Sequence, residues 1–261
     1  MGLVLQLVLS PAAIASWGFR VPFVIGAVLA VVVFALRRGL VETRAVETVA
    51  KARDAPRSSV LHLVREHPME ALAVIGLTAG GTLAFYAYTT YMQKFLVVTS
   101  GFTKETATRI TAAALAIFMV LQPAFGALSD RVGRRPLMIA FGIAGAVLTV
   151  PIFEGVARAR DPLVAFLLVL GALVIVSGYT SINAVVKAEL FPAEIRTLGV
   201  ALPYAIANTM FGGTAEYVAL WFKKEGVERA FYVYVAGGIA VSLLVYVFMR
   251  ETKTKSRIVE D

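Results

Sequence analysis

Seven long runs of apolar residues constrain this 261-residue chain more than any other feature. The runs lie near 21–36, 70–92, 108–128, 137–153, 163–185, 198–220 and 230–248. A helix needs about 20 apolar residues to cross the hydrocarbon of a bilayer, and most of these runs have that length. The first and fourth are shorter, so flanking residues must complete the crossing. The pattern predicts an all-α membrane protein with seven full spans.

Composition excludes several other classes of protein. Hydrophobic residues make up 59% of the chain and charged residues 16%, a balance that is too apolar for a soluble domain of this size. The net charge of +8 would suit a nucleic-acid partner, but the basic residues lie between apolar runs, so membrane topology explains them better. The chain has no cysteine, and we interpret His62 and His67 as solvated linker residues rather than ligands. We therefore expect no enzyme site, metal or cofactor, and no nucleic-acid partner.

A polar linker divides the chain. Before it, residues 1–36 hold one full run and the apolar piece from Gly2 to Ala15, which Pro11 interrupts and which is too short to cross alone. This piece lacks a basic segment in front of it, so it resembles the end of a helix more than a signal peptide. We expect a linker at 37–69, a six-span block at 70–249 and a tail at 250–261.

The distribution of basic residues predicts the orientation. If the linker is placed inside the cell, 16 of the 25 Lys and Arg residues lie on that side and 9 on the other. Cytoplasmic loops carry the excess of Lys and Arg, so the linker and the C-terminus are expected in the cytoplasm.

Several polar residues fall inside the apolar runs, where such groups usually face a bundle interior or a cavity. At about 100° per residue, the second run carries a polar face of Thr82, Tyr86, Thr89 and Gln93, with Lys94 beside it. Gly80 and Gly81, just before this face, are expected to unwind or kink the helix. Cavity lining is favoured over helix packing for this face.

Two other runs carry comparable faces. Asn208, Gly212 and Glu216 lie within about 80° of one another on the sixth run, and we favour cavity lining there too. On the fifth run, Asn183 is equally well explained by a hydrogen bond between helices. Lys187, one turn further on, is expected at the cytoplasmic mouth.

Two loops on the expected cytoplasmic side complete the pattern. One reads Gly126-Ala-Leu-Ser-Asp130-Arg-Val-Gly133-Arg134-Arg135-Pro136, and the other is Glu189-Leu-Phe-Pro-Ala-Glu-Ile-Arg196. Asp130 can cap a helix N-terminus, and Gly133 permits a tight turn. An ordinary positively charged loop is the alternative interpretation of the first loop. The order of its residues and the matching loop downstream argue against that alternative.

These motifs resemble those of the major facilitator superfamily, and most closely its metabolite–proton symporter branch with the α-ketoglutarate permeases. The stretches that carry the resemblance are Trp17–Phe23, Phe85–Phe95, Gln122–Asp130, Lys187–Arg196 and Phe211–Leu220. Members of the superfamily have twelve spans in two halves. The resemblance implies that this chain holds the C-terminal six-helix half, plus one full helix and a partial helix of the N-terminal half.

The resemblance also implies roles for individual residues. It links the Trp17–Phe23 motif, and Arg20 in it, to transport, although Arg20 is equally well explained as an interfacial anchor. Residues expected at the substrate site are Arg20, Tyr86, Lys94, Asn183, Asn208 and Glu216. Residues expected to form a cytoplasmic gate, by pairing across the two loops, are Asp130, Arg134, Arg135, Glu189 and Arg196.

The function implied is secondary transport, with proton-coupled symport of a dicarboxylate such as α-ketoglutarate across a bacterial inner membrane. The expected partners are a small organic acid, a proton, the lipid bilayer and an N-terminal half. One alternative is a fragment that does not transport, because Met1 falls inside an apolar helix. Another is a symporter of a different organic acid or of a zwitterionic osmolyte.

Overall fold

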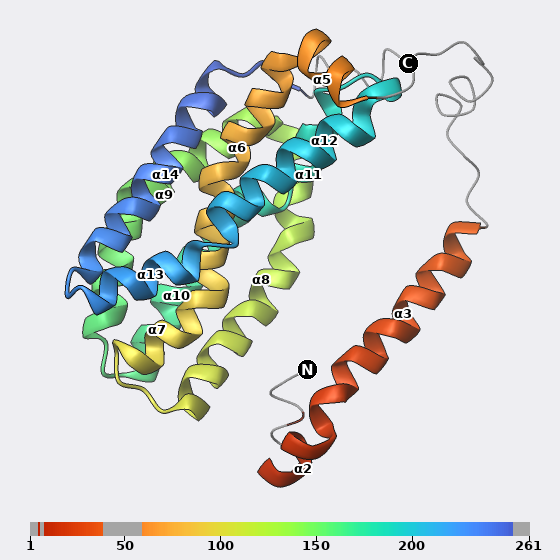
Figure 1. Ribbon diagram of the computed structural model, residues 1–261. Helices are drawn as coiled ribbons and strands as arrows, with labels where there is room; N and C mark the ends of the chain where they lie inside the picture. Colours follow the sequence, from red (N-terminus) through yellow and green to blue (C-terminus); the bar gives the residue numbers. More distant parts are fainter. Residues whose placement is uncertain (1–4, 6–7, 39–58, 253–261) are drawn as a thin grey trace. The chain divides into compact units, whose positions relative to one another are not determined.

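The structure, a computed structural model, describes residues 5, 8–38 and 59–252 (Figure 1). The chain forms two compact units, residues 1–53 and 54–261, which are described separately. The described residues are helical and contain no strand.

The first unit has two described helices, joined by a short 3-10 turn. They are α2 (Pro11–Ser16), η1 (Gly18–Arg20) and α3 (Val21–Arg38). The Ser10 side chain caps α2 by accepting a hydrogen bond from the Ala13 backbone N–H at 3.3 Å. Residues 18–36 are long and apolar enough to cross a membrane, which confirms the span predicted at 21–36.

The second unit is a bundle of long helices. Its elements are α5 (Val60–Glu66), α6 (Pro68–Tyr86), η2 (Ala87–Tyr91), α7 (Met92–Val98), α8 (Lys104–Val132), α9 (Arg134–Arg158), α10 (Pro162–Thr180), α11 (Asn183–Glu189), α12 (Ala193–Ala207), η3 (Asn208–Gly212), α13 (Ala215–Lys224) and α14 (Glu228–Phe248). The segments η2 and η3 are single π-helical turns. We call its two ends the α5 end and the α7 end.

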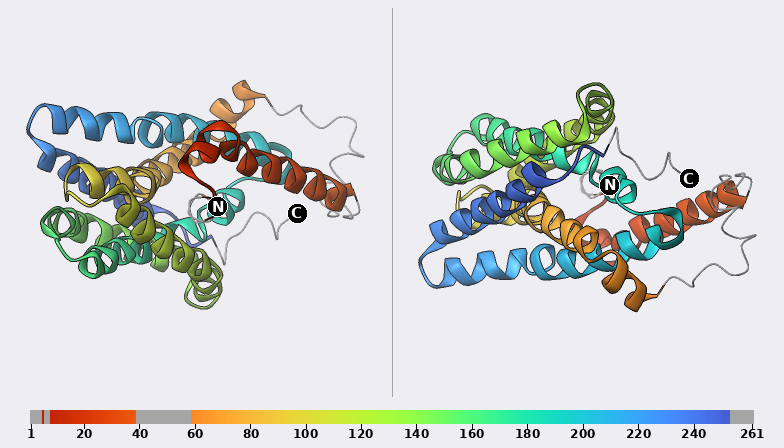
Figure 2. Two further views of the ribbon diagram at one scale, coloured as in Figure 1. Left: turned by 90° about the horizontal axis from the view of Figure 1, so that it is seen from below. Right: turned by 90° about the horizontal axis from the view of Figure 1, so that it is seen from above.

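Six helices among the described residues are long and apolar enough to be membrane spans, whereas the sequence predicts seven. The missing one is the run at 198–220. Its residues form α12, η3 and α13, which follow one another in one direction along the bundle (Figures 1 and 2). A turn at Gly213 and Thr214 separates η3 from α13, so no single helix covers the run. Together, α12, η3 and α13 still run in one direction along the bundle.

The bundle packs as two similar triplets of helices. The main contacts are α9 with α14, α6 with α14, α9 with α10, α8 with α10, and α6 with α12. Exchanging α6, α8 and α9 for α10, α12 and α14 maps this set of contacts onto itself. Such a pattern is what an inverted structural repeat produces.

Glycines allow the helices of the bundle to approach closely. A Cβ added at Gly80 would lie 2.3 Å from the Gly238 carbonyl oxygen of α14, and one at Gly81 would lie 2.4 Å from the Tyr179 ring. The Gly80 N–H also donates to the Ser242 hydroxyl at 2.8 Å. The helix does not unwind at Gly80 and Gly81, because both stay inside α6, where they serve packing.

Part of the linker predicted at 37–69 is structured. Residues 39–58 lie outside the described residues, but α5 packs on the bundle through Leu63, which is buried against Val74, Phe191 and Ile195. The side chains of His62 and His67 are 25% and 16% exposed. They are therefore partly buried at the α5 end, and their interpretation as solvated loop residues is wrong.

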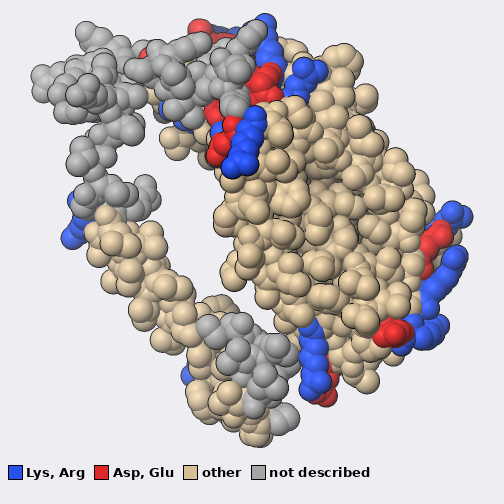
Figure 3. All heavy atoms as spheres, turned by 180° about the vertical axis from the view of Figure 1, so that it is seen from behind, with Lys and Arg blue, Asp and Glu red and all other residues tan. Residues whose placement is uncertain are grey.

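Charged side chains gather at the two ends of the second unit and leave an uncharged band between them (Figure 3). At the α7 end, Arg229 pairs with Glu154 at 2.9 Å and Lys223 with Glu228 at 3.4 Å. An uncharged band between two charged ends is the distribution that a bilayer requires.

Candidate functional site

Polar side chains form two contacts between helices of the second unit, one between α6 and η3 and one between α8 and α10. The Thr82 hydroxyl of α6 donates to the Asn208 side-chain oxygen of η3 at 2.9 Å. Thr82 is 5% exposed, so this bond lies well inside the unit. The carboxamide of Asn208 thus faces α6, as the predicted polar face of the sixth run requires.

A charged pair lies closer to the α7 end, on two elements that follow α6 and η3 along the chain. Lys94 Nζ contacts the Glu216 carboxylate in a hydrogen-bonded ion pair between α7 and α13. The side chains are 44% and 37% exposed, so solvent or a solute can reach both. Tyr86 lies between this pair and Thr82, and its ring would be 2.7 Å from a Cβ at Gly212. Glycine at 212 therefore lets α6 and η3 close around the ring.

A second polar contact joins α8 to α10. The Gln122 side chain of α8 accepts a hydrogen bond from the Thr180 hydroxyl at 2.8 Å and donates to the Ser177 hydroxyl at 3.3 Å. Sequence reasoning quoted Gln122 only as part of a motif. A glutamine beside Pro123 in an otherwise apolar run was the available signal.

Asn183 continues this line of polar groups toward the α5 end. Its amide donates to the Thr180 carbonyl at 2.9 Å, and its side-chain oxygen accepts from Lys187 Nζ at 3.0 Å. The interhelical hydrogen bond considered for Asn183 is replaced by bonds along its own segment. Lys187 is only 1% exposed, so its predicted place at an open mouth is wrong.

Arg20 belongs to the first unit. It ends η1, is exposed, and its guanidinium carbon lies 5.3 Å from the centroid of the Phe19 ring. A cation over an aromatic ring at a helix end is compatible with an interfacial anchor. Its role in substrate recognition stays a prediction.

The α5 end carries an ion-pair cluster around Arg134. The guanidinium Nη1 donates to Asp130 at 2.5 Å and to the Ser129 hydroxyl at 2.6 Å, while Nε lies 3.7 Å from the Glu189 carboxylate. Asp130 is at the end of α8, Arg134 at the start of α9 and Glu189 at the end of α11. The cluster therefore ties three helix ends together, as the two loop motifs led us to expect.

The other two predicted gate residues bind backbone carbonyls. Arg135 donates to the carbonyls of Tyr246 and Val247 at the end of α14. Arg196 donates to the carbonyls of Ala188 and Phe191 at 3.2 Å and 3.0 Å. Positive side chains satisfy the last carbonyls of a helix in this way. Both side chains therefore hold chain segments next to the cluster around Arg134. These hydrogen bonds go to backbone carbonyls and are not ion pairs.

Two residues of the predicted tail also join this end of the unit. Glu251 accepts hydrogen bonds from the backbone N–H groups of Arg134 and Arg135 at 2.9 Å and 3.1 Å. The Thr252 hydroxyl donates to Glu189 at 2.5 Å. A carboxylate at the N-terminus of α9 is electrostatically favourable. These contacts were not predictable from the sequence, because a polar residue after the last span resembles any solvated tail.

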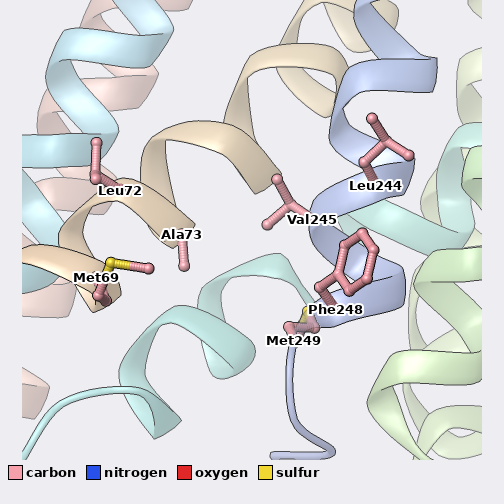
Figure 4. Close-up of a pocket in the computed structure, with 7 residues that line it drawn as sticks. All are labelled: Met69, Leu72, Ala73, Leu244, Val245, Phe248 and Met249. Atoms are coloured by element: carbon pink, nitrogen blue, oxygen red, sulfur yellow. The ribbon is translucent and has the colours of Figure 1, made fainter.

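An apolar groove of about 360 Å³ opens between the start of α6 and the end of α14. It is lined by Met69, Leu72, Ala73, Leu244, Val245, Phe248 and Met249 (Figure 4). A charged solute would find no polar partner in this lining, so the groove does not match the polar faces described above. We therefore place the candidate site on the elements that carry the polar contacts, which are α6, α8, α10 and η3.

Comparison with known proteins identifies the family. Residues 41–258 match the family described as sugar (and other) transporter, which is part of the major facilitator superfamily. The chain belongs to this transporter family. The match confirms the resemblance found in the sequence, the partial major facilitator fold and the multi-pass membrane character. Members of the family are transporters and not enzymes, in line with the expectation for this chain.

Three curated relatives are similar to this transporter chain. The α-ketoglutarate permease of Escherichia coli (strain K12) is 49% identical over 242 residues, 93% of this chain and 55% of the permease. The citrate-proton symporter of Klebsiella pneumoniae is 32% identical over 82% of this chain and 48% of its own length. The proline/betaine transporter of Salmonella typhimurium is 28% identical over 92% and 50%. The chain thus spans about half the length of the curated relatives it matches, and no solved structure matches it.

Proposed function

We propose that this chain supplies the second half of a secondary transporter that carries a dicarboxylate such as α-ketoglutarate together with a proton. The observation that carries the proposal is the set of part-buried polar contacts between α6 and η3 and between α8 and α10, in otherwise apolar helices. Polar groups at membrane depth are costly and usually mark a solute or ion pathway. The 49% identity to an α-ketoglutarate permease supports the choice of solute.

The cluster around Arg134 is proposed as the cytoplasmic gate of this carrier. It joins the ends of α8, α9 and α11, which would have to separate or tilt when one half of a carrier rocks against the other. Each ion pair at such a surface stabilises the closed state only weakly, so the network would act as a whole. The excess of Lys and Arg on this side supports a cytoplasmic location for the α5 end in a bacterial inner membrane.

A chimeric carrier tests the function. Residues 1–261 are joined behind the part of the E. coli α-ketoglutarate permease that the chain does not match, and the protein is expressed in cells lacking dicarboxylate permeases. We expect uptake of labelled α-ketoglutarate well above the empty-vector level. Dissipating the proton gradient with a protonophore should abolish accumulation.

The same cells separate the alternatives. Uptake of proline or betaine without α-ketoglutarate uptake would favour the osmolyte symporter. Uptake of citrate alone would favour another organic acid. A chimeric carrier that reaches the membrane and transports none of these solutes would favour the interpretation of the chain as a fragment that does not transport.

A further inference from the structure

Lys187 is a buried cation for which the described residues provide no carboxylate. It is 1% exposed, and among the described residues its only hydrogen bond is to the neutral Asn183 side-chain oxygen at 3.0 Å. Burying a charge is unfavourable unless it is paired and hydrogen-bonded. An ammonium group has three N–H donors, of which Asn183 engages one. The site therefore has the charge and the donors to hold an anion.

The Lys187 side chain points into the unit and away from the ion-pair cluster. Glu189 follows it by two residues, which places the two side chains about 200° apart on the helix. Nζ reaches back to Asn183, four residues earlier and roughly 6 Å deeper along the helix axis. A lysine that only needed hydration would extend toward the nearest aqueous end instead.

Two aromatic rings line the space around the ammonium group. Nζ lies 4.2 Å from the centroid of the Tyr204 ring on α12 and 5.8 Å from that of Tyr179 on α10. The faces of such rings attract a cation, and their bulk keeps water away from it. Tyr204 is 39% exposed, so one of the two rings that contact the ammonium group can itself be reached from outside the unit.

Hydrogen bonds connect Lys187 to the polar contact between α8 and α10. They run from Gln122 to Thr180, from Thr180 to Asn183, and from Asn183 to Lys187, with distances of 2.8, 2.9 and 3.0 Å. Lys94, which belongs to α7, provides positive charge near the α7 end. The polar faces thus carry one lysine toward each end.

We propose that Lys187 is a carboxylate-binding residue of the transport site, where Nζ exchanges Asn183 for a carboxylate of the solute. This inference rests on the proposed function for its solute class, an organic acid with two carboxylates. Lys187 binds one carboxylate at the α5 side of the site, and a hydrogen bond to an ionised carboxylate is stronger than one to the neutral amide oxygen that it replaces.

Binding of labelled α-ketoglutarate to the purified chain 1–261 tests the proposal. We expect Lys187→Gln to weaken binding at least tenfold and to remove the preference for α-ketoglutarate over pyruvate, which has one carboxylate. Lys187→Arg keeps the charge and should retain most of the affinity. Lys224→Gln, at an exposed lysine that ends α13, is the matched control and should bind like the unmodified chain.

Melting temperatures of the same samples separate binding from folding. Lys187→Gln should melt no lower than the unmodified chain, because it removes a buried charge. Equal α-ketoglutarate affinity in Lys187→Gln, or no binding by the unmodified chain, would overturn the proposal. Lower melting temperatures of both Lys187 variants, with unchanged affinity for α-ketoglutarate, would also overturn the proposal. They would indicate that Lys187 pairs with a carboxylate of the protein. Binding that depends on Lys187, in a chimeric carrier that does not transport, would instead refute the proposed function and leave this assignment standing.

Discussion

Lys94 and Glu216 show how a partly exposed ion pair can matter for recognition without mattering for the fold. Pairs of this exposure contribute about 0–1 kcal/mol to stability. A dianionic solute, however, would gain from Lys94 and be repelled by Glu216 unless that carboxylate stays paired or protonated. We therefore propose that this pair takes part in recognition of a charged solute.

In the chimeric carrier, we expect Lys94→Gln to reduce α-ketoglutarate uptake far more than proline uptake. Only the dicarboxylate carries a net negative charge, so only this solute loses an attraction when the positive charge of Lys94 is removed. Initial uptake rates of both solutes, measured beside the Lys224→Gln control, check this. Equal losses for the two solutes would remove the argument from charge.

Asp130→Asn should lower the maximal transport rate several-fold and leave the KM for α-ketoglutarate within about twofold. Asp130 contacts Arg134 at 2.5 Å but is 67% exposed and lies at a helix end, so its loss alters gating and not the solute site. Uptake measured over a range of concentrations distinguishes the two parameters. A large rise in KM at a normal maximal rate would contradict the gate assignment.

At the residue scale, the sequence predicts which polar side chains share one face of a helix. Helical spacing places Asn208 and Glu216 on one face, and a carboxylate inside an apolar run is conspicuous. The burial of Lys187 was not predictable, because it depends on Tyr204, which α12 brings across from another part of the chain. Glu251 was missed for a similar reason, since its partners are backbone N–H groups.

The two π-helical turns are the feature of the elements that the sequence did not indicate. The turns η2 and η3 interrupt the helices that carry Thr82, Lys94, Asn208 and Glu216. A π-helical turn widens the backbone locally and re-aims the side chains that follow, and such turns are frequent at functional sites. Their residues, such as Thr89, have no composition that sets them apart from ordinary helix.

Helix packing around Gly80 gives a prediction at the scale of elements. Gly80→Ala should destabilise the protein by about 1–3 kcal/mol, because its Cβ would meet the backbone of Gly238 and force α6 away from α14. Gly237→Ala is the control, because a Cβ there meets nothing within 4 Å and alanine favours the helix. Thermal unfolding of the purified variants in detergent measures both. A melting temperature for Gly80→Ala at or above that of the unmodified chain would show that the helices are not in this close contact.

At the scale of the molecule, run length and polarity predicted the membrane class and five of the six spans of the second unit. The sixth differs because Gly213 and Thr214 end a helix that hydropathy alone would continue. The pairing of the two helix triplets was not readable from run lengths. It follows from small residues such as Gly80 and Gly142, whose absent side chains let specific helices meet.

The proposed carrier needs two halves, because alternating access moves one half against the other around a shared site. We therefore expect residues 1–261 expressed alone to give no α-ketoglutarate uptake above the empty-vector level, and the chimeric carrier to give clear uptake. Both proteins should be compared at equal amounts in the membrane. Uptake by the chain alone would mean that its copies associate into a working carrier.

Cysteine accessibility shows whether the polar face shared by α6 and η3 lines the solute path. The chain has no cysteine, so Asn208→Cys and the control Val147→Cys each introduce one reactive position once any cysteine of the joined segment is replaced by serine. Val147 is 64% exposed on α9, away from the polar contacts. A hydrophilic thiol reagent needs a thiolate in water. We expect the reagent to label position 208, α-ketoglutarate to slow this labelling, and position 147 to stay unlabelled. Labelling at 147 but not at 208, or labelling at 208 that α-ketoglutarate does not slow, would contradict this expectation.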